Sequence, residues 1–345
     1  MPDMSMLNKS DKPILRLASH MDIAVVANFI NEHWEQGHIL ARDRELFEFM
    51  YLEKDGRLNF VIALDPQSNE VIAILGYIPS DGLHSRISLS MWKARPDAHL
   101  RKYKAGLAVL RFLIDELNPM SIFSTGISAD TRDVYKFLGY SCYVMNHHVV
   151  INNQIAEFKI IKNPPLLDFY SYSSASSASS FAVVLSDEEL RNAASKLEFT
   201  ETLKETQYLC HRYLHHPMFK YEVREVLQND TTVGVIFFRR LFANNRSCIR
   251  VIDLVGAEIC LKSAIGPLVQ EMHINGDEYI DLLSWGLDEG QVNEAGFANC
   301  REFTDCVVPE YFSPFSQKTV ELWLFTNLPD SEIIYKGDGD QDRPN

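Results

Sequence analysis

The sequence predicts the α/β (α+β) fold class, with two similar units in tandem that each contain a mixed, mostly antiparallel sheet flanked by helices. Two observations predict this class. Strand-like and helix-like segments alternate along the chain, and their order in the first half recurs in the second half with little residue identity. The length of 345 residues corresponds to two domains at about 150 residues each. We expect these domains at residues 1–155 and 156–345.

The first half begins with a strand-like segment and an amphipathic helix, in which Ile23, Val26, Phe29 and Ile30 recur at helical spacing. Seven further elements are predicted in order: a helix over 41–54, a hairpin over 59–79, a strand over 86–94, a long helix over 100–117, a strand over 121–128, a helix over 131–139 and a strand over 143–152.

The second half repeats this order after a Ser/Ala-rich stretch at 170–180, which we interpret as an exposed linker. Asn229 and Asp230 mark the turn of its hairpin. The predicted elements are a strand over 181–186, helices over 187–198 and 202–216, a hairpin over 221–241, a strand over 247–256, a helix over 261–276, a strand over 279–286, a helix over 289–300 and a strand over 318–326.

Composition excludes several classes of function. The formal net charge of −14 argues against general nucleic-acid binding and against binding to an anionic membrane surface. No apolar run approaches the roughly 20 residues that cross a bilayer, and the first residues contain no apolar signal-like segment. We therefore expect a cytoplasmic protein. Its six cysteines form no CxxC pair and are expected to be buried free thiols.

Residues 132–144, RDVYKFLGYSCYV, join a predicted helix to a predicted strand. Tyr135 lies four residues before Gly139, and a glycine followed by an aromatic residue can end a helix and redirect the chain. A phenol has a reference pKa near 10, so it stays protonated at neutral pH and can donate a proton. Tyr135 is therefore a candidate general acid, and a core tyrosine on an amphipathic helix is the alternative.

A basic segment, residues 93–104, precedes the long helix of the first half in an otherwise acidic protein. Gly106 and Ala108 follow it at the helix start, where small residues let backbone N–H groups approach a phosphate closely. The pattern predicts an anion site, with a solvated helix start as the alternative. The cations are Lys93, Arg95, Arg101, Lys102 and Lys104.

Together these segments resemble the GNAT superfamily of N-acyltransferases. VYKFLGY is similar to its Y-x-x-x-G-F corner, with Tyr140 replacing phenylalanine, and YKAGLA (103–108) to its Q/R-x-x-G-x-G/A pyrophosphate loop, with Tyr103 replacing Gln or Arg. The resemblance implies acyl-CoA as cosubstrate, no metal, and Tyr135 as the acid for the leaving thiolate. It implies coenzyme contacts from Trp92, Lys93, Arg95, Arg101, Lys102, Tyr103, Lys104, Ala105, Gly106 and Ala108.

The same resemblance implies a β-bulge in the strand that enters this loop, whose backbone N–H polarises the thioester carbonyl. We place it at Ser90, Met91 and Trp92, so Ser90 and Met91 join the catalytic candidates. The second half departs from the family pattern: Ser263 and Pro267 lie in its loop, and Val292 takes the position of the tyrosine. We expect the second unit to supply acceptor binding and packing.

The whole chain is similar to the tandem-GNAT acyltransferases of bacterial surface-polysaccharide pathways, of the FdhC type. Segments 30–52, 210–223 and 335–345 carry this resemblance. It implies transfer of an acetyl or 3-hydroxybutyryl group to the amine of a nucleotide-linked sugar, such as a dTDP-3-amino-3,6-dideoxyhexose. Acceptor contacts are expected from Arg212, Tyr213, His215, His216, Trp285 and Arg343.

Other interpretations stay open. The acceptor could be another small amine or an amino acid, the chain could be a non-catalytic acyl-CoA-binding module, and a homodimer is possible. His84, Asp253 and Asp288 are weak candidates for a general base. His211 and His215 lie four residues apart on a predicted helix, but they lack the further ligands of a zinc site.

The last residues, GDGDQDRPN, alternate Asp338, Asp340 and Asp342 with other residues. The pattern resembles a calcium loop, but the chain ends before the downstream glutamate that such a loop needs. We expect an acidic tail that frays. Docking of the tail over the acceptor site, with Arg343 on a phosphate, is the alternative.

Overall fold

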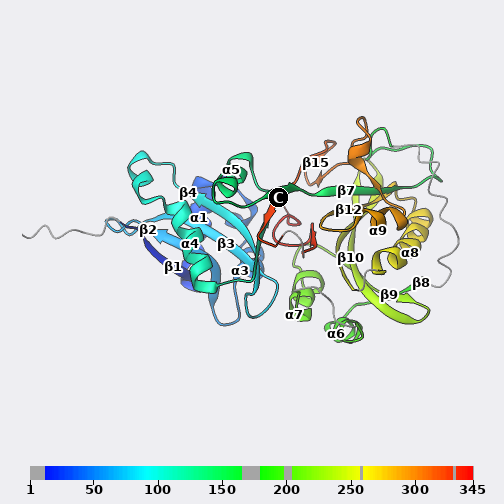
Figure 1. Cartoon of the computed structure of the whole chain (residues 1–345), viewed down its shortest axis with the longest axis horizontal. Coiled ribbons are helices and arrows are strands. Elements are labelled where there is room, and N and C mark those ends of the chain that lie inside the picture. The colour runs from blue at the N-terminus through cyan, green and yellow to red at the C-terminus, as the bar shows by residue number, and fades with distance from the viewer. Residues whose placement is uncertain (1–11, 165–178, 198–203, 257–258, 329–331, 345) are drawn as a thin grey trace, which may run out of the picture. The chain divides into compact units, whose positions relative to one another are not determined.

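The structure is a computed structural model that describes residues 12–164, 179–197, 204–256, 259–328 and 332–344. Contacts divide the chain between Ser124 and Thr125 into two compact units, which we call unit 1 and unit 2 (Figure 1). Most of the Ser/Ala-rich stretch at 170–180 lies outside the described residues. No helix in the described part of the chain is long and apolar enough to cross a membrane.

Unit 1 is a sheet covered by helices. Its elements are β1 (Ile14–Ser19), η1 (His20–Asp22), α1 (Ile23–His33), α2 (Ile39–Arg42), α3 (Arg44–Tyr51), β2 (Arg57–Leu64), β3 (Val71–Pro79), β4 (Arg86–Ala94), η2 (Ala98–Tyr103), α4 (Ala105–Leu117) and β5 (Ser121–Thr125), whose last residue begins unit 2.

The sheet of unit 1 has the order β1-β2-β3-β4-β5. Its first three pairings are antiparallel, and β4 pairs with β5 in parallel. The buried residues of α1 are Ile23, Val26, Phe29 and Ile30, as their helical spacing predicted. α4 buries Val109 among others, and its C-cap is Asn118, which has a left-handed backbone.

Unit 2 contains a second, larger sheet with helices. Its elements are α5 (Ala129–Phe137), β6 (Cys142–Val144), β7 (Asn146–Ile151), β8 (Ser179–Val183), α6 (Asp187–Ser195), α7 (Thr206–Leu209), the π-helical turn η4 (Cys210–Leu214), β9 (Glu222–Gln228), β10 (Thr231–Ala243), β11 (Arg246–Gly256), α8 (Cys260–Asn275), β12 (Tyr279–Trp285), α9 (Glu289–Glu294), β13 (Ala298–Asn299), η5 (Cys300–Glu302), β14 (Tyr311–Phe312), β15 (Phe315–Ser316), β16 (Trp323–Thr326) and β17 (Ile334–Tyr335).

The main sheet of unit 2 has the order β13-β7-β12-β11-β10-β9-β8, and β17 also pairs with β12. Asn229 and Asp230 form the β9–β10 turn with φ angles of 50° and 61°, as a type I′ turn requires. α8 packs on one core cluster of this sheet, and α6 and α7 contribute to another. The six cysteines are free thiols, and five are buried.

The strand order of unit 1 recurs in unit 2. Three antiparallel pairings, β8–β9, β9–β10 and β10–β11, are followed by one parallel pairing, β11–β12. The predicted fold class and the predicted repeat are therefore confirmed. The contact boundary differs from the expected one at residue 155, because β7 pairs in antiparallel register with β12 of unit 2.

The acidic tail does not fray, so that expectation is wrong. Ile334, Tyr335 and Asp338 are buried in unit 2, as are Asp340 and Asp342. β17, just before the tail, extends the main sheet by pairing with the end of β12. Local composition suggested solvation because the cations that pair with Asp338 and Asp342, Lys204 and Arg239, lie far away in the sequence.

Candidate active site

β4 of unit 1 carries a β-bulge close to the basic segment. The register of the β3–β4 ladder shifts beside Gly76, so Met91 and Trp92 of β4 share one partner position. Met91 has a φ of 45°, a left-handed conformation that is unusual for a non-glycine residue. The bulge expected within Ser90–Trp92 is therefore confirmed in position. Such bulges take backbone groups out of a ladder and redirect neighbouring side chains.

The side chain of Ser90 packs inside unit 1. Its hydroxyl lies 3.0 Å from the hydroxyl of Tyr51. A Cβ on Gly76 would lie 2.8 Å from Ser90 Oγ and 2.9 Å from the ring of Phe60, so only glycine fits behind the bulge. Any catalytic contribution of Ser90 would therefore come from its backbone.

Trp92 connects the bulge to the start of α4. Its indole N–H donates a hydrogen bond of 2.8 Å to the carbonyl oxygen of Gly106. Lys104 precedes the helix with a φ of 47°. The first N–H groups of a helix have no acceptor within it, and the helix dipole makes this end attractive to anions. The bond thus holds the N-terminal end of α4 beside the bulged strand.

The residues of η2 place positive charge before this helix end. Arg101, Lys102 and Lys104 are exposed. Tyr103 is buried, and the ammonium of Lys102 lies 4.8 Å from the centre of its ring. Tyr103, which replaces the Gln or Arg of the GNAT pattern, therefore supports the loop through packing, and the exposed cations supply its charge.

Arg95 has a different environment from the other cations of the basic segment. Its guanidinium contacts Glu70 at 3.0 Å and Asp97 at 2.8 Å. Two carboxylates therefore compensate its charge. Among the contacts of the described residues, Arg95 is the predicted phosphate-binding cation that takes part in ion pairs.

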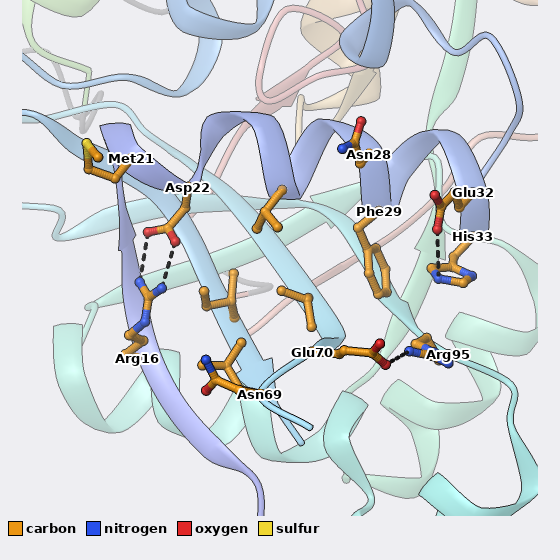
Figure 2. Close-up of a pocket in the computed structure, with 14 residues that line it drawn as sticks. Arg16, Met21, Asp22, Asn28, Phe29, Glu32, His33, Asn69, Glu70 and Arg95 are labelled. Carbon is orange, nitrogen blue, oxygen red and sulfur yellow. Dashed lines mark hydrogen bonds and ion pairs between the residues drawn. The ribbon is translucent and has the colours of Figure 1, made fainter. Parts of the chain in front are cut away.

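A hollow of about 550 Å³ lies beside α1 in unit 1 (Figure 2). Its rim carries the Arg95–Glu70 pair and the Arg16–Asp22 pair, in which hydrogen bonds from Arg16 lower the pKa of Asp22. With Glu32, its lining contains three carboxylates and two guanidiniums, so it disfavours a polyanion such as coenzyme phosphate. Its other lining residues are Met21, Val25, Asn28, Phe29, His33, Ile62, Leu64, Asn69 and Val71.

The spacing of Tyr135 and Gly139 has a structural cause. α5 ends in a Schellman motif: Gly139 N–H donates to Lys136 O at 3.0 Å, and Tyr140 N–H donates to Tyr135 O at 3.0 Å. Gly139 has a φ of 90°, which favours glycine. The rings of Tyr135 and Tyr140 meet edge to face at 6.2 Å, the apolar contact that accompanies this motif.

The Tyr135 side chain lies inside unit 2. It is 1 % exposed and stacks on Phe325 of β16, with ring centres 3.7 Å apart. Ser128 caps the start of α5 by accepting from Thr131 N at 3.2 Å. The capped helix α5 and the stacking on Phe325 therefore both restrain the ring of Tyr135.

The same helix ending occurs on α9, with valine in place of tyrosine. Gly296 N–H donates to Asn293 O at 2.9 Å, and Phe297 N–H donates to Val292 O at 3.2 Å. Gly296 has a φ of 94°. The motif thus forms without a phenol, so helix termination explains the glycine and the aromatic residue but does not require a tyrosine at position 135.

Most of the predicted acceptor residues make contacts within unit 2. Arg212 is buried and donates to Asp342 O at 3.0 Å, and Tyr213 is buried and donates to Asp253 at 2.7 Å. His215 is exposed and lies 2.6 Å from Asp187. These contacts tie the 210–216 segment to its own unit.

Trp285 and Arg343 also have partners in unit 2. Trp285 ends β12, pairs with Ile334 of β17, and packs against Tyr143 with ring centres 4.7 Å apart. Arg343 forms an ion pair with Asp340. The alternative in which the tail docks with Arg343 on a phosphate thus competes with this ion pair.

The weak candidates for a general base also have structural partners. Asp288 caps α9 by accepting from Gln291 N at 2.9 Å. His84 is buried, and burial lowers its pKa. Asp253 pairs with Lys204 at 2.5 Å. Across the described ranges no group of three or more His, Cys, Asp or Glu side chains could hold a metal ion.

His216 is buried as a neutral acceptor. Its Nδ1 accepts from Met218 N at 3.2 Å and from Phe219 N at 2.9 Å. Burial, followed by the nearby charge of Arg212, lowers the pKa of His216 to about 3. A protonated ring could not accept either hydrogen bond.

We expect acid destabilisation through His216. In the unfolded chain His216 has a pKa near 6.5, so it binds a proton below that pH, whereas in the folded chain it does not bind one until about pH 3. The folded state therefore loses stability as the pH falls below 6.5. Between pH 6.5 and 5.5 wild type should lose about 1 kcal/mol more unfolding free energy than His216→Asn, which keeps an acceptor. Urea titrations at both pH values measure this. Equal losses would contradict the assignment.

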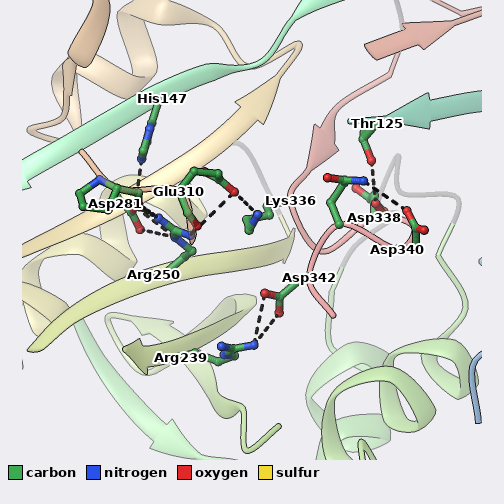
Figure 3. A network of polar contacts seen from close by, with 12 residues as sticks. Thr125, His147, Arg239, Arg250, Asp281, Glu310, Lys336, Asp338, Asp340 and Asp342 are labelled. Carbon is green, nitrogen blue, oxygen red and sulfur yellow. Dashed lines mark hydrogen bonds and ion pairs between the residues drawn. The ribbon is translucent and has the colours of Figure 1, made fainter. Parts of the chain in front are cut away.

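Sequence reasoning missed the cations that hold the tail. In Figure 3, Arg239 faces Asp342, and a chain of contacts runs from His147 through Asp281, Arg250 and Glu310 to Lys336. The alternating aspartates were the available signal. A buried acid must be paired, so an ordered acidic tail would have required buried cations elsewhere.

Comparison with known proteins adds information at the level of fold. No protein-family model and no curated protein matches this sequence. A protein of unknown function from Enterococcus faecalis V583, described as a "Probable N-Acyltransferase", has a TM-score of 0.56 at 10% identity over 91% of this chain and 72% of its own. A GCN5-related N-acetyltransferase from Anabaena variabilis ATCC 29413 has a TM-score of 0.53 at 13% identity over 91% and 72%.

The chain has the GCN5-related N-acetyltransferase (GNAT) fold. Eis1 from Mycobacterium abscessus is also similar, with a TM-score of 0.50 at 14% identity over 90% of this chain and 73% of its own. These similarities cover 90–91% of this chain, so they extend over both units. At such identities the similarity concerns the GNAT fold, and the chemistry must be argued from the residues.

Proposed function

We propose that this protein is an acyl-CoA-dependent N-acyltransferase with its coenzyme site in unit 1. The observation that carries the proposal is the Trp92–Gly106 hydrogen bond, which joins the β4 bulge to the helix end that we propose binds the coenzyme phosphates. Arg101, Lys102 and Lys104 place exposed positive charge beside that helix end in a protein of net charge −14. A polyanionic coenzyme needs such a local patch when the overall charge repels it.

The proposed reaction is direct transfer. The acceptor amine attacks the thioester carbonyl carbon, a C–N bond forms, and the C–S bond breaks. A backbone N–H at the Met91 bulge stabilises the negative charge on the carbonyl oxygen. Tyr135 gives its proton to the departing thiolate, and the amine loses a proton to water or a base.

For the acceptor we propose the amino group of a nucleotide-linked amino-deoxysugar, such as a dTDP-3-amino-3,6-dideoxyhexose, acylated with an acetyl or 3-hydroxybutyryl group. The resemblance of segments 30–52 and 210–223 supports this choice. A different small amine or an amino acid is the competing acceptor, and a non-catalytic acyl-CoA-binding module is the competing function. The contacts of Arg212 and Tyr213 within unit 2 do not favour any of these acceptors.

Thiol release tests the proposal. Purified protein is incubated with acetyl-CoA or 3-hydroxybutyryl-CoA and a panel of acceptors: a dTDP-amino sugar, free amino acids and simple amines. We expect acceptor-dependent release of thiol and an acylated amino sugar by mass spectrometry. Activity on other amines alone would change the acceptor, binding of CoA without turnover would support the module, and absence of CoA binding would refute the proposal.

Trp92→Phe should weaken coenzyme binding. The substitution keeps an aromatic ring but removes the donor to Gly106 O, so the start of α4 loses a hydrogen bond of about 1 kcal/mol. We expect the Kd for CoA to rise roughly fivefold to tenfold, by calorimetry, with the fold retained. Trp34→Phe, at a half-exposed position on the C-cap of α1, is the matched control. An unchanged Kd for Trp92→Phe would argue against this helix end as the coenzyme site.

A further inference from the structure

Each unit contains a pair of parallel strands that separate after a short ladder. In unit 1, β4 and β5 pair only from Arg86 to Ser88 on the β4 side. In unit 2, β11 and β12 pair only from Ile249 to Val251 on the β11 side. A β-bulge follows each ladder, at Met91 in β4 and at Ile252 in β11. The corresponding strands therefore diverge at the same place in both units.

The C-terminal segment fills the divergence in unit 2. Tyr335 pairs with Ser284 of β12, and the next amide, Lys336 N–H, donates to Leu283 O at 3.1 Å. Gly337 N–H then donates to Ile252 O of β11 at 2.9 Å. The segment thus bonds to both strands through consecutive backbone amides, as an extended ligand would in a gap between strands.

Close approach of the segment depends on glycine at two points. A Cβ on Gly337 would lie 2.8 Å from Ile252 Cγ2, 2.9 Å from Ile252 O, and against the hydroxyl of Tyr213. A Cβ on Gly286 would meet the carbonyl oxygen of Glu332. Both the tail and the end of β12 are therefore shaped for this contact.

Ion pairs fix the segment on either side of the gap. Lys204 contacts Asp338 at 3.1 Å. Lys336 pairs with Glu310, and Asp342 lies 3.2 Å from Arg239 (Figure 3). All are buried or nearly so, where an unpaired charge would be costly. The segment is therefore built into unit 2 and is not laid over its surface.

Unit 2 also differs from unit 1 at the following helix. In unit 1, β4 ends at Ala94 and α4 begins at Ala105, with the basic η2 between them. In unit 2, β11 ends at Gly256 and α8 begins at Cys260, too close for such a loop. Lys262, on the first turn of α8, contacts Glu294 at 3.0 Å. The start of α8 therefore presents less positive charge to a polyanion than the start of α4 does.

We infer that segment 334–338 is a permanent intramolecular occupant of the strand gap of unit 2, and that the chain holds one coenzyme site, in unit 1. Only the second part of the inference, the single coenzyme site in unit 1, rests on the proposed function. The pantetheine arm of CoA is an extended chain with amide groups, the same chemistry as the backbone that occupies the gap in unit 2.

Hydrogen exchange and binding stoichiometry test the two halves separately. In the full chain the amides of Lys336 and Gly337 should exchange at least roughly 1000-fold more slowly than in an unstructured peptide. Saturating CoA should leave these rates unchanged, and calorimetry should give one CoA per chain. Fast exchange, or exchange accelerated by CoA, would overturn the occupant. Two CoA per chain would overturn the single site, and none would refute the proposed function while leaving the occupant intact.

Gly337→Ala supplies a perturbation. It should raise the exchange rate at 336 and 337 by roughly tenfold or more and leave the Kd for CoA within twofold of wild type. Gly276→Ala is the control, because its added Cβ meets nothing within 4 Å, although its φ of 68° brings backbone strain. Equal exchange at 336 and 337 in both variants would contradict the close fit. If Gly337→Ala fails to fold, the measurements on the full chain decide the inference.

Discussion

Replacing Tyr135 with phenylalanine is expected to lower the turnover number roughly 10–1000-fold while leaving the Kd for acyl-CoA unchanged. Phenylalanine keeps the stack on Phe325 and the Schellman hydrogen bonds, which use the backbone of Tyr135. The substitution removes only the phenolic hydroxyl, so the leaving thiolate would depart without its proton donor. Steady-state thiol release and calorimetric CoA titration measure the two quantities.

Tyr140→Phe is the matched control, since Tyr140 belongs to the same ring cluster and contacts Tyr135 and Phe325. It should retain turnover within about threefold, the range expected when no proton donor is lost. If Tyr135→Phe also retains turnover, the phenol is a core residue and thiolate departure needs another acid. A parallel loss of stability and turnover would likewise indicate a packing role, so urea unfolding accompanies both variants.

Replacing Lys204 with methionine is expected to destabilise the protein by about 3–5 kcal/mol. The side chain of Lys204 is 2 % exposed and bridges Asp253 and Asp338, which are fully buried. Methionine fills similar space but leaves two acids without their cation. Because Asp338 belongs to the tail, the variant should also accelerate amide exchange at Lys336. Chemical unfolding and hydrogen exchange give the two results.

Lys196→Met is the matched control, because Lys196 also pairs with a carboxylate in unit 2, Glu225, at 2.9 Å, but is half exposed. Its loss should cost less than about 1 kcal/mol. A similar cost for both lysines would contradict the buried-pair interpretation.

The cost of Lys204→Met should depend on pH. Burial raises the pKa of Asp253, and Lys204 opposes that rise. Without Lys204 the folded pKa should lie further above the unfolded value near 3.9. A raised carboxyl pKa gives stability that is present at low pH and lost as the pH rises, so the deficit of Lys204→Met should shrink from pH 8 toward pH 5. An equal deficit at both pH values would argue against a further rise in the pKa of Asp253 in the variant.

Local sequence patterns predicted much of the fold and part of the candidate site. The helical spacing of Ile23, Val26 and Phe29 predicted the buried face of α1 because periodicity is a property of the helix itself. The Gly139–Tyr140 corner was readable for the same reason, since a Schellman motif is set by consecutive residues. The bulge near Met91 was placed by resemblance to the GNAT pattern and is confirmed.

Pairings across long sequence distances could not be predicted in this way. β7 pairs with β12 in unit 2, so the contact boundary differs from residue 155. Arg95 belonged by sequence to a cationic segment, but Glu70 from the β2–β3 connection neutralises it. Neither contact can be predicted from the local composition, because each joins residues that are far apart in the chain.

By itself the sequence determined the fold class, the repeat of elements and the places where helices end, because these follow from periodicity and backbone chemistry within a few residues. Only the tertiary structure decided the fate of the acidic tail. Asp338 and Asp342 would be solvated in an isolated segment, and they become interior residues because Lys204 and Arg239 supply opposite charge inside unit 2. Charge compensation at a distance is a property of the folded chain, so local sequence could not reveal it.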